Sequence, residues 1–83
     1  MKFEGKGYDI IIASPPEYEE LVAEIYFNGL FVAQLNIENG AADIELETAD
    51  SLVSQSMVCR KVDLKGFIET IEIARQRLVG ERP

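Results

Sequence analysis

The first long apolar run of the chain, residues 8–13 (YDIIIA), predicts a β-strand. Its three successive isoleucines are β-branched, which favours extended backbone and a strand with both faces at least partly covered. A Ser-Pro-Pro sequence follows, and proline cannot donate a hydrogen bond to a strand ladder, so the strand is expected to end there. Residues 1–7, with two glycines and two lysines, are expected to be frayed.

Residues 17–27 fit two patterns. Four side chains recur at helical spacing after an SPPE sequence that resembles a helix N-terminus: Tyr18, Leu21, Val22 and Ile25. Asn28-Gly29, the dipeptide most typical of a two-residue hairpin, then stands between EIYF and LFVAQL, both rich in residues that favour strands. We favour the hairpin, and a helix over this segment stays open as the alternative.

The predicted hairpin determines which residues of its two strands pair and therefore on which face of the sheet each side chain lies. A type I′ turn at Asn28-Gly29 sets Tyr26 opposite Phe31, Ile25 opposite Val32 and Val22 opposite Leu35. A second Asn-Gly, at 39–40, sets Leu35 opposite Ile44. The expected core face then consists of Val22, Tyr26, Phe31, Ala33, Leu35, Ile37, Ala42, Ile44 and Leu46. The other face has an apolar half that needs a separate cover, from the chain itself or from a partner: Ile25, Phe27, Leu30 and Val32.

A single helix is predicted over residues 63–79, with Asp63 as its N-cap. The stripe expected to cover the core face is Leu64, Phe67, Ile68, Ile71, Arg75 and Leu78, and Ile73 is expected to point away from it. Residues 49–57 (ADSLVSQSM) are expected to form a loop, and VCRKV a short edge strand. The prediction is an α+β fold in one domain spanning 1–83. Hairpins over 8–48 form an antiparallel β-meander of about four to five strands, with one C-terminal α-helix packed on one face.

The amino-acid composition restricts the classes of function that the protein can have. Eighty-three residues make one small domain, and the chain has no histidine and a single cysteine, Cys59. The usual zinc sites, an internal disulfide and histidine-activated nucleophiles are therefore excluded. Cys59 is accompanied by no base and no second thiol, so we expect it to act as a small buried hydrophobe. We expect a protein that is not an enzyme, with no cofactor and no metal.

Negative charge is concentrated in the first part of the chain. The net charge is −7: residues 1–50 hold eleven acids against two lysines, and residues 51–83 hold four acids against six basic residues. Such a field repels nucleic acids and anionic membranes and favours encounter with a basic partner, although acidity also serves solubility. Three carboxylates alternate along one strand, a pattern more typical of a half-solvated strand than of a calcium or magnesium site. The candidate partner-binding residues are Glu17, Tyr18, Glu19, Glu20, Glu24, Tyr26, Asp43, Glu45, Glu47 and Asp50.

Targeting signals are not recognisable in the chain. No apolar run precedes Tyr8, so we expect no signal peptide, and no stretch approaches the roughly 20 apolar residues of a membrane span. The lone thiol agrees with a reducing compartment. We expect a cytoplasmic protein.

The order of these segments resembles a known group of proteins. YDIII, a Pro-Pro turn, LVAEIYFNG, a following VA strand and CRKVDLKGF leading into one helix look like the small acidic bacterial immunity proteins of polymorphic or contact-dependent toxin systems. The resemblance implies a protein that binds one cognate toxin polypeptide, expected to be basic, and neutralises it by steric and electrostatic complementarity. It carries no residue-level binding motif. A nucleic-acid-mimicking inhibitor and a small homodimeric structural domain are the alternatives.

Overall fold

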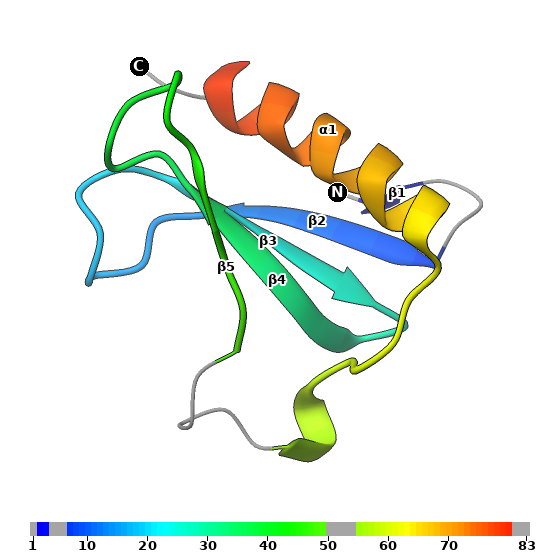
Figure 1. The fold of residues 1–83 in the computed structure, drawn as a ribbon. Helices are drawn as coiled ribbons and strands as arrows, with labels where there is room; N and C mark the ends of the chain where they lie inside the picture. The colour runs from blue at the N-terminus through cyan, green and yellow to red at the C-terminus, as the bar shows by residue number, and fades with distance from the viewer. Residues whose placement is uncertain (1, 4–6, 50–54, 81–83) are drawn as a thin grey trace.

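The computed structural model describes residues 2–3, 7–49 and 55–80, which form one antiparallel sheet and one long helix (Figure 1). The five strands follow each other in chain order across the sheet, each antiparallel to its neighbour. An α+β meander with a C-terminal helix is therefore confirmed. The elements are β1 (Lys2–Phe3), β2 (Tyr8–Ala13), β3 (Val22–Phe27), β4 (Leu30–Asn36), β5 (Glu45–Glu47), the 3₁₀ turn η1 (Gln55–Met57) and α1 (Leu64–Gly80).

The Asn28-Gly29 turn forms as the sequence predicts. Both residues have positive φ, 51° and 83°, which a type I′ turn requires. Phe27 pairs with Leu30 and Tyr26 with Phe31, as expected from the turn. The segment before the turn is therefore strand from Val22 onward, and the helical alternative is wrong.

A β-bulge between Ile25 and Tyr26 shifts the rest of this hairpin by one residue. Ile25 pairs with Ala33 instead of Val32, and Val22 pairs with Asn36 instead of Leu35. Because side chains alternate between the faces of a strand, a one-residue shift exchanges the faces. The core that meets α1 therefore contains Ala23 and Ile25, so the predicted core face was wrong for β3.

The second hairpin closes through a longer connection than predicted. Leu35 pairs with Leu46 instead of Ile44, a shift of two residues that keeps the same faces. The connection turns at Gly40, whose N–H donates to the Ile37 carbonyl at 3.0 Å and whose φ is 96°.

Helix α1 begins at the predicted cap. The Asp63 carboxylate accepts a hydrogen bond from the Gly66 N–H at 2.7 Å, which satisfies one of the free donors of the first turn. A Cβ on Gly66 would lie 2.5 Å from the same carboxylate oxygen, so glycine leaves room for the cap. The Tyr8 hydroxyl donates to the other Asp63 oxygen at 3.3 Å and ties the cap to β2. Burial, followed by the charge of Asp63, raises the pKa of Tyr8 to about 12.

The helix packs on β3 and β2 through small residues, not through the predicted stripe. Its buried residues follow each other at every fourth position: Gly66, Thr70, Ala74 and Leu78. This line lies about a quarter turn from the centre of the predicted stripe, given 3.6 residues per turn. Leu64 and Ile68 are consequently 72% and 56% exposed. Ile73, expected to point outward, packs against the core.

Two further segments differ from expectation. Lys2–Phe3, expected to be frayed, pair with β2 as the strand β1. VCRKV does not form an edge strand: Val58 makes an isolated parallel bridge to Phe31, and the Cys59 N–H donates to the Phe31 carbonyl at 2.8 Å. Cys59 is half-buried, and its thiol lies 3.4 Å from the Lys61 carbonyl.

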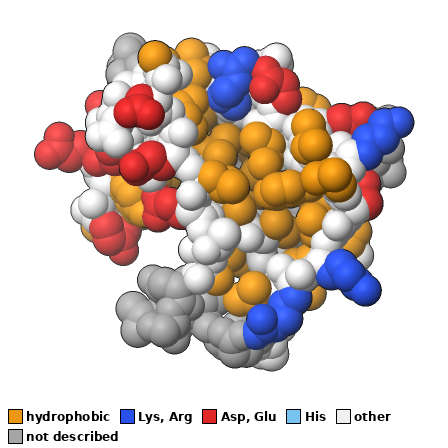
Figure 2. Space-filling view, viewed as in Figure 1, with side chains coloured by type: hydrophobic (Ala, Val, Ile, Leu, Met, Phe, Trp, Pro, Cys, Tyr) orange, Lys and Arg blue, Asp and Glu red, His pale blue; other side chains and the backbone are white. Residues whose placement is uncertain are grey.

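The surface divides into acidic and apolar regions (Figure 2). Asp and Glu side chains gather at the left of the view, where the connections from β2 to β3 and from β4 to β5 lie. Hydrophobic side chains form a field beneath α1, with Lys and Arg at its edge. Among the described residues, no helix has the length and apolar character needed to cross a membrane.

Candidate functional site

The face of the sheet opposite α1 carries polar and aromatic side chains. Directly paired residues project from the same face of a sheet. Glu24 pairs with Gln34, and Gln34 pairs on its other side with Glu47, so these side chains form a row across β3, β4 and β5. Tyr26 pairs with Phe31 on the same face, and their rings meet edge to face at 5.8 Å.

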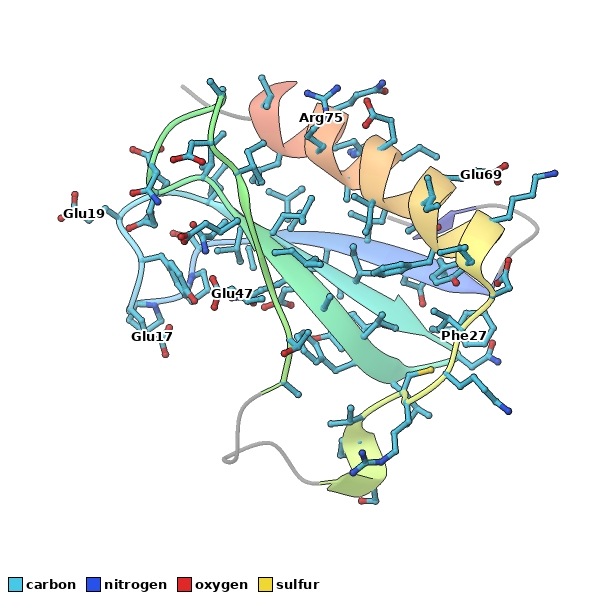
Figure 3. The ribbon with its side chains drawn as sticks, viewed as in Figure 1. Glu17, Glu19, Phe27, Glu47, Glu69 and Arg75 are labelled. Atoms are coloured by element: carbon cyan, nitrogen blue, oxygen red, sulfur yellow. The ribbon has the colours of Figure 1, made fainter. Side chains whose placement is uncertain are left out.

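The connection from β2 to β3, which carries Glu17 and Glu19 at the left of Figure 3, places Tyr18 over this row. It turns at the two prolines, where the Tyr18 N–H donates to the Pro15 carbonyl at 3.2 Å. The Tyr18 hydroxyl donates to Glu47 at 2.6 Å and accepts from the Gln34 amide at 3.1 Å. The hydrogen bond to Glu47, followed by burial, raises the pKa of Tyr18 to about 12. Tyr18 therefore remains protonated and acts as a fixed donor to Glu47 at neutral pH.

Glu38 fixes the same connection from the other side. Its carboxylate accepts the N–H groups of Glu19 and Glu20 at 3.1 and 2.7 Å. The Glu38 N–H in turn donates to the side-chain oxygen of Asn36 at 3.2 Å. Backbone donors held by a carboxylate form strong hydrogen bonds, so Glu38 positions the segment that carries Tyr18.

Asn36 links the strands beneath the pocket. It is only 3% exposed, and its side-chain amide donates to Glu45 at 3.2 Å and to Glu47. With its oxygen occupied by the Glu38 N–H, Asn36 joins three glutamates. An amide is needed here because it offers donors to the carboxylates and an acceptor to the backbone.

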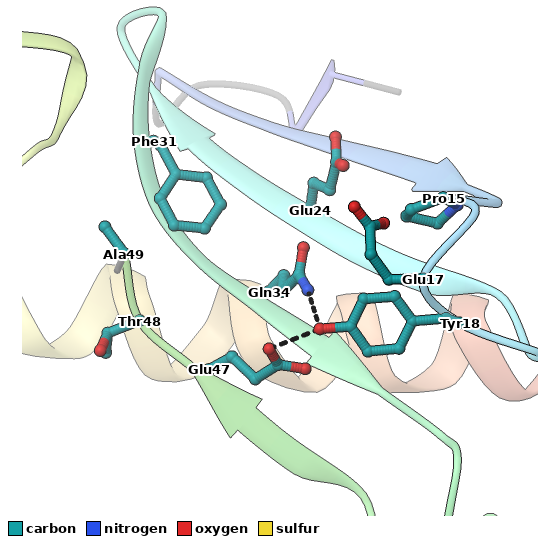
Figure 4. Close-up of a pocket in the computed structure, with 9 residues that line it drawn as sticks. All are labelled: Pro15, Glu17, Tyr18, Glu24, Phe31, Gln34, Glu47, Thr48 and Ala49. Carbon is teal, nitrogen blue, oxygen red and sulfur yellow. Dashed lines mark hydrogen bonds between the residues drawn. The ribbon is translucent and has the colours of Figure 1, made fainter. Parts of the chain in front are cut away.

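The side chains on this face of the sheet line an open pocket of about 380 Å³ (Figure 4). Its lining is Pro15, Glu17, Tyr18, Glu24, Phe31, Gln34, Glu47, Thr48 and Ala49. Three of the nine lining residues are carboxylates, and none is Lys or Arg. Glu24 accepts a hydrogen bond from the Tyr26 hydroxyl at 3.2 Å, and burial, followed by the charge of Glu24, raises the pKa of Tyr26. The pocket is therefore negative, with aromatic rings in and beside it.

The three carboxylates that line the pocket do not converge on one point. Within the described part of the chain, no three Asp, Glu or Cys side chains converge closely enough to hold a metal. A guanidinium or ammonium group on a side chain can reach separated carboxylates and also contact Tyr18 and Phe31 through their ring faces.

The structure gathers part of the predicted binding set. Glu17, Tyr18, Glu24 and Glu47 line the pocket, while Tyr26 and Glu45 lie beside it in its hydrogen-bond network. The remaining predicted residues lie apart: Glu19 and Glu20 offer backbone N–H groups to Glu38, Asp43 is exposed in the connection before β5, and Asp50 falls outside the described residues.

Sequence reasoning missed Phe31, Gln34, Asn36 and Glu38. The available signal was the pair of polar residues at alternate positions of an otherwise apolar strand, LFVAQLN. Two buried or half-buried amides on one strand face indicate a polar network on that face.

Comparison with known protein families, with curated proteins and with solved structures finds no match to this chain.

Proposed function

We propose that the protein is an immunity-type inhibitor that binds a basic protein through the acidic pocket and neutralises it. One observation carries the proposal: three carboxylates line the pocket without a Lys or Arg among its nine lining residues. A cation from a partner that enters the pocket is attracted by all three carboxylates.

Among the described residues, no Lys or Arg lines the pocket. The ion pair between Glu72 and Arg75 is on α1, on the side of the sheet away from the pocket. The pocket carboxylates instead accept hydrogen bonds from neutral groups, Tyr18 and Asn36 on Glu47 and Tyr26 on Glu24. These bonds fix the positions of the oxygens before a partner arrives, which reduces the entropy cost of binding.

The size of the pocket fits one long side chain. Small-molecule sites usually range from about 300 to 1,000 Å³, and this pocket, at about 380 Å³, lies near the lower end. An arginine side chain would place its planar head among Glu17, Glu24 and Glu47 and its stem along the rings of Tyr18 and Phe31. The surrounding acids then accelerate encounter with a basic partner surface.

The resemblance to immunity proteins supports a toxin domain as the proposed partner. An enzyme whose substrate is anionic has a basic active-site surface, and an acidic inhibitor covers it by occupying the same charges. The resulting complex has one copy of each chain and shows no turnover.

Capture of the partner tests the proposal. The tagged protein is recovered from its native cell at low and at high salt, beside the pocket variant Glu17→Gln/Glu24→Gln and the control variant Asp43→Asn/Glu69→Gln. Both variants lose two charges, and Gln at position 24 can still accept from Tyr26. We expect one basic polypeptide at near one-to-one amount, which the control retains and the pocket variant binds at least about tenfold more weakly, a loss of about 1.4 kcal/mol in binding free energy.

Two results would contradict the proposal separately. Equal recovery by the two variants would exclude the pocket from the interface. A captured polypeptide that does not arrest growth when expressed alone, or whose arrest is not relieved by co-expression of this protein, would exclude the immunity role.

A further inference from the structure

The Gln34 side chain lies at the centre of the polar row on the sheet face opposite α1. It comes from β4, directly opposite Glu24 of β3 on one side and Glu47 of β5 on the other. Neighbouring strands of a sheet lie about 4.8 Å apart, so a glutamate flanks the Gln34 amide on each side. The direction of this amide decides what the pocket can bind, because one end of an amide donates hydrogen bonds and the other accepts them.

Tyr18 fixes the direction of the Gln34 amide. A hydroxyl has one hydrogen, and the Tyr18 hydroxyl donates it to Glu47 at 2.6 Å, because an ionised carboxylate can only accept. The same hydroxyl must therefore accept from Gln34, whose amide nitrogen lies 3.1 Å away. The Gln34 oxygen is consequently turned to the other side, toward Glu24 and Glu17 (Figure 4).

Glu47 is already held on both of its oxygens. The Tyr18 hydroxyl donates to one oxygen, and the side-chain amide of Asn36, which is 3% exposed, donates to the other. The charge of Glu47 still attracts a cation. A donor from a partner would, however, have to share these oxygens with two hydrogen bonds that are already formed.

The half of the pocket at Glu24 leaves its acceptors open. One Glu24 oxygen accepts from the Tyr26 hydroxyl at 3.2 Å. Among the residues that the structure describes, none donates to the second Glu24 oxygen, to the Gln34 oxygen or to the Glu17 carboxylate. Acceptors from β3, β4 and the β2–β3 connection therefore face one opening. The chemical complement of this arrangement is a group with several donors and no acceptor.

A guanidinium group has that chemistry. Its five N–H donors lie in one plane and point in separate directions, and it has no acceptor. It can therefore donate to acceptors on neighbouring strands at the same time. An ammonium group directs three donors from a single nitrogen and is more strongly hydrated. The Phe31 ring lines the same pocket and provides a surface on which a planar cation can stack.

We propose that Glu24 and the Gln34 oxygen form an arginine-binding site within the pocket, and that Gln34 distinguishes an arginine of the partner from a lysine. The inference rests on the proposed function, since it names the side chain through which the basic protein is bound. Tyr18 is a positioning residue in this site, because its hydroxyl sets the direction of the Gln34 amide. Glu17 and Glu47 contribute charge, which attracts either cation.

Titration of the isotope-labelled full chain with two small probes tests the site without the partner. The probes are N-acetyl-arginine amide and N-acetyl-lysine amide, which carry the same charge. The nuclear magnetic resonance signals of the Gln34 side-chain amide and the Glu24 backbone amide are followed. We expect a dissociation constant about fivefold lower for the arginine probe, the ratio that one additional hydrogen bond to a neutral acceptor gives.

The ratio of the two dissociation constants separates Gln34 from the surrounding charge. Gln34→Met removes the amide oxygen, keeps a side chain of similar length, and should abolish the preference for arginine. Tyr18→Phe keeps the ring and removes the hydroxyl, so the Gln34 amide can turn and the preference should decrease. Glu17→Gln is the matched control, because loss of its charge should weaken the binding of both probes and leave their ratio unchanged.

Three results would overturn the inference: equal dissociation constants for the two probes in the wild-type protein, an arginine preference that persists in Gln34→Met, or no saturable shift with the arginine probe up to its solubility limit. The proposed function is tested separately. Capture of a basic toxin that the pocket variant loses would support that function even if the two probes bind equally. An arginine preference without a captured toxin would support the site and not the immunity role.

Discussion

Replacement of Asn36 by aspartate tests the network beneath the pocket. Asn36 is 3% exposed and donates to Glu45 and Glu47, while its oxygen accepts the Glu38 N–H. Asn36→Asp keeps the size and the acceptor but replaces both donors with a carboxyl facing two carboxylates. A hydrogen bond to a charged group contributes about 1.5–3 kcal/mol, and two such bonds are lost. Because Glu45 is exposed and water screens its charge, we expect the free energy of unfolding to fall by about 2–4 kcal/mol at pH 7.5.

The loss should depend on pH with a defined sign. Burial and the two neighbouring carboxylates raise the pKa of the introduced carboxyl in the folded protein above its unfolded value of about 3.9. A raised pKa means that the folded state binds the proton more tightly. Folding of the variant is therefore favoured below about pH 3.9, where the carboxyl is protonated and can donate to Glu47. This contribution is lost as the pH rises through the folded-state pKa.

The assay is urea unfolding followed by far-ultraviolet circular dichroism at pH 4 and pH 7.5, with wild type measured at each pH. Asn39→Asp is the matched control because Asn39 is exposed in the connection between β4 and β5. The control should change the free energy of unfolding by less than about 0.5 kcal/mol. An equal destabilisation of Asn36→Asp at both pH values, or one no larger than that of the control, would refute the reasoning.

The remaining predictions concern the helix cap and the tyrosines. Asp63→Ala removes the cap on Gly66 and the acceptor of the Tyr8 hydroxyl. The free energy of unfolding in urea should therefore fall by about 2 kcal/mol. A fall of less than about 0.5 kcal/mol would contradict the role of Asp63 as the cap. The pKa values of Tyr8 and Tyr18, raised from 10.0 to about 12, give stability that is present below pH 10 and is lost as the pH rises toward 12. Tyr18→Phe, which also removes the Tyr18 hydroxyl that donates to Glu47, should make this alkaline loss of stability less steep. Phenolate absorbance from every tyrosine at pH 10 would contradict the raised pKa values.

Local turn and cap chemistry predicted most of the fold. Asn28-Gly29 set the first hairpin and Asp63 set the start of α1, because each depends on residues adjacent in sequence. The strand faces could not be predicted in the same way. IYF and LFVA are apolar at consecutive positions, so alternation does not select a face, and the bulge at Ile25/Tyr26 decided it.

The orientation of α1 shows a second limit. The large apolar side chains predicted the buried face, but Gly66, Thr70 and Ala74 allow the helix axis to lie close to the sheet. Close packing of the backbones over small side chains prevailed over burial of Leu64 and Ile68. The apolar stripe of α1 therefore contains both residues that pack against the core and residues that are exposed.

The sequence predicted the negative charge of the site but not the arrangement of its side chains. Acidic residues could be counted from the sequence, but their convergence depends on Glu38 and Tyr18, which are brought together by tertiary contacts between two connections. The neutral members, Gln34 and Asn36, carry no charge signal. Their contribution is visible only from the hydrogen bonds that they make across the strands.

The rates of binding to the captured partner test the acidic pocket most directly. The protein, the pocket variant Glu17→Gln/Glu24→Gln and the control Asp43→Asn/Glu69→Gln are compared at matched ionic strength. Loss of a distant charge slows association, whereas loss of a contact within the interface speeds dissociation. We predict that both variants associate more slowly and that only the pocket variant dissociates faster, by about tenfold or more, a difference of about 1.4 kcal/mol. Equal dissociation rates for the pocket and control variants would show that the pocket does not contact the partner.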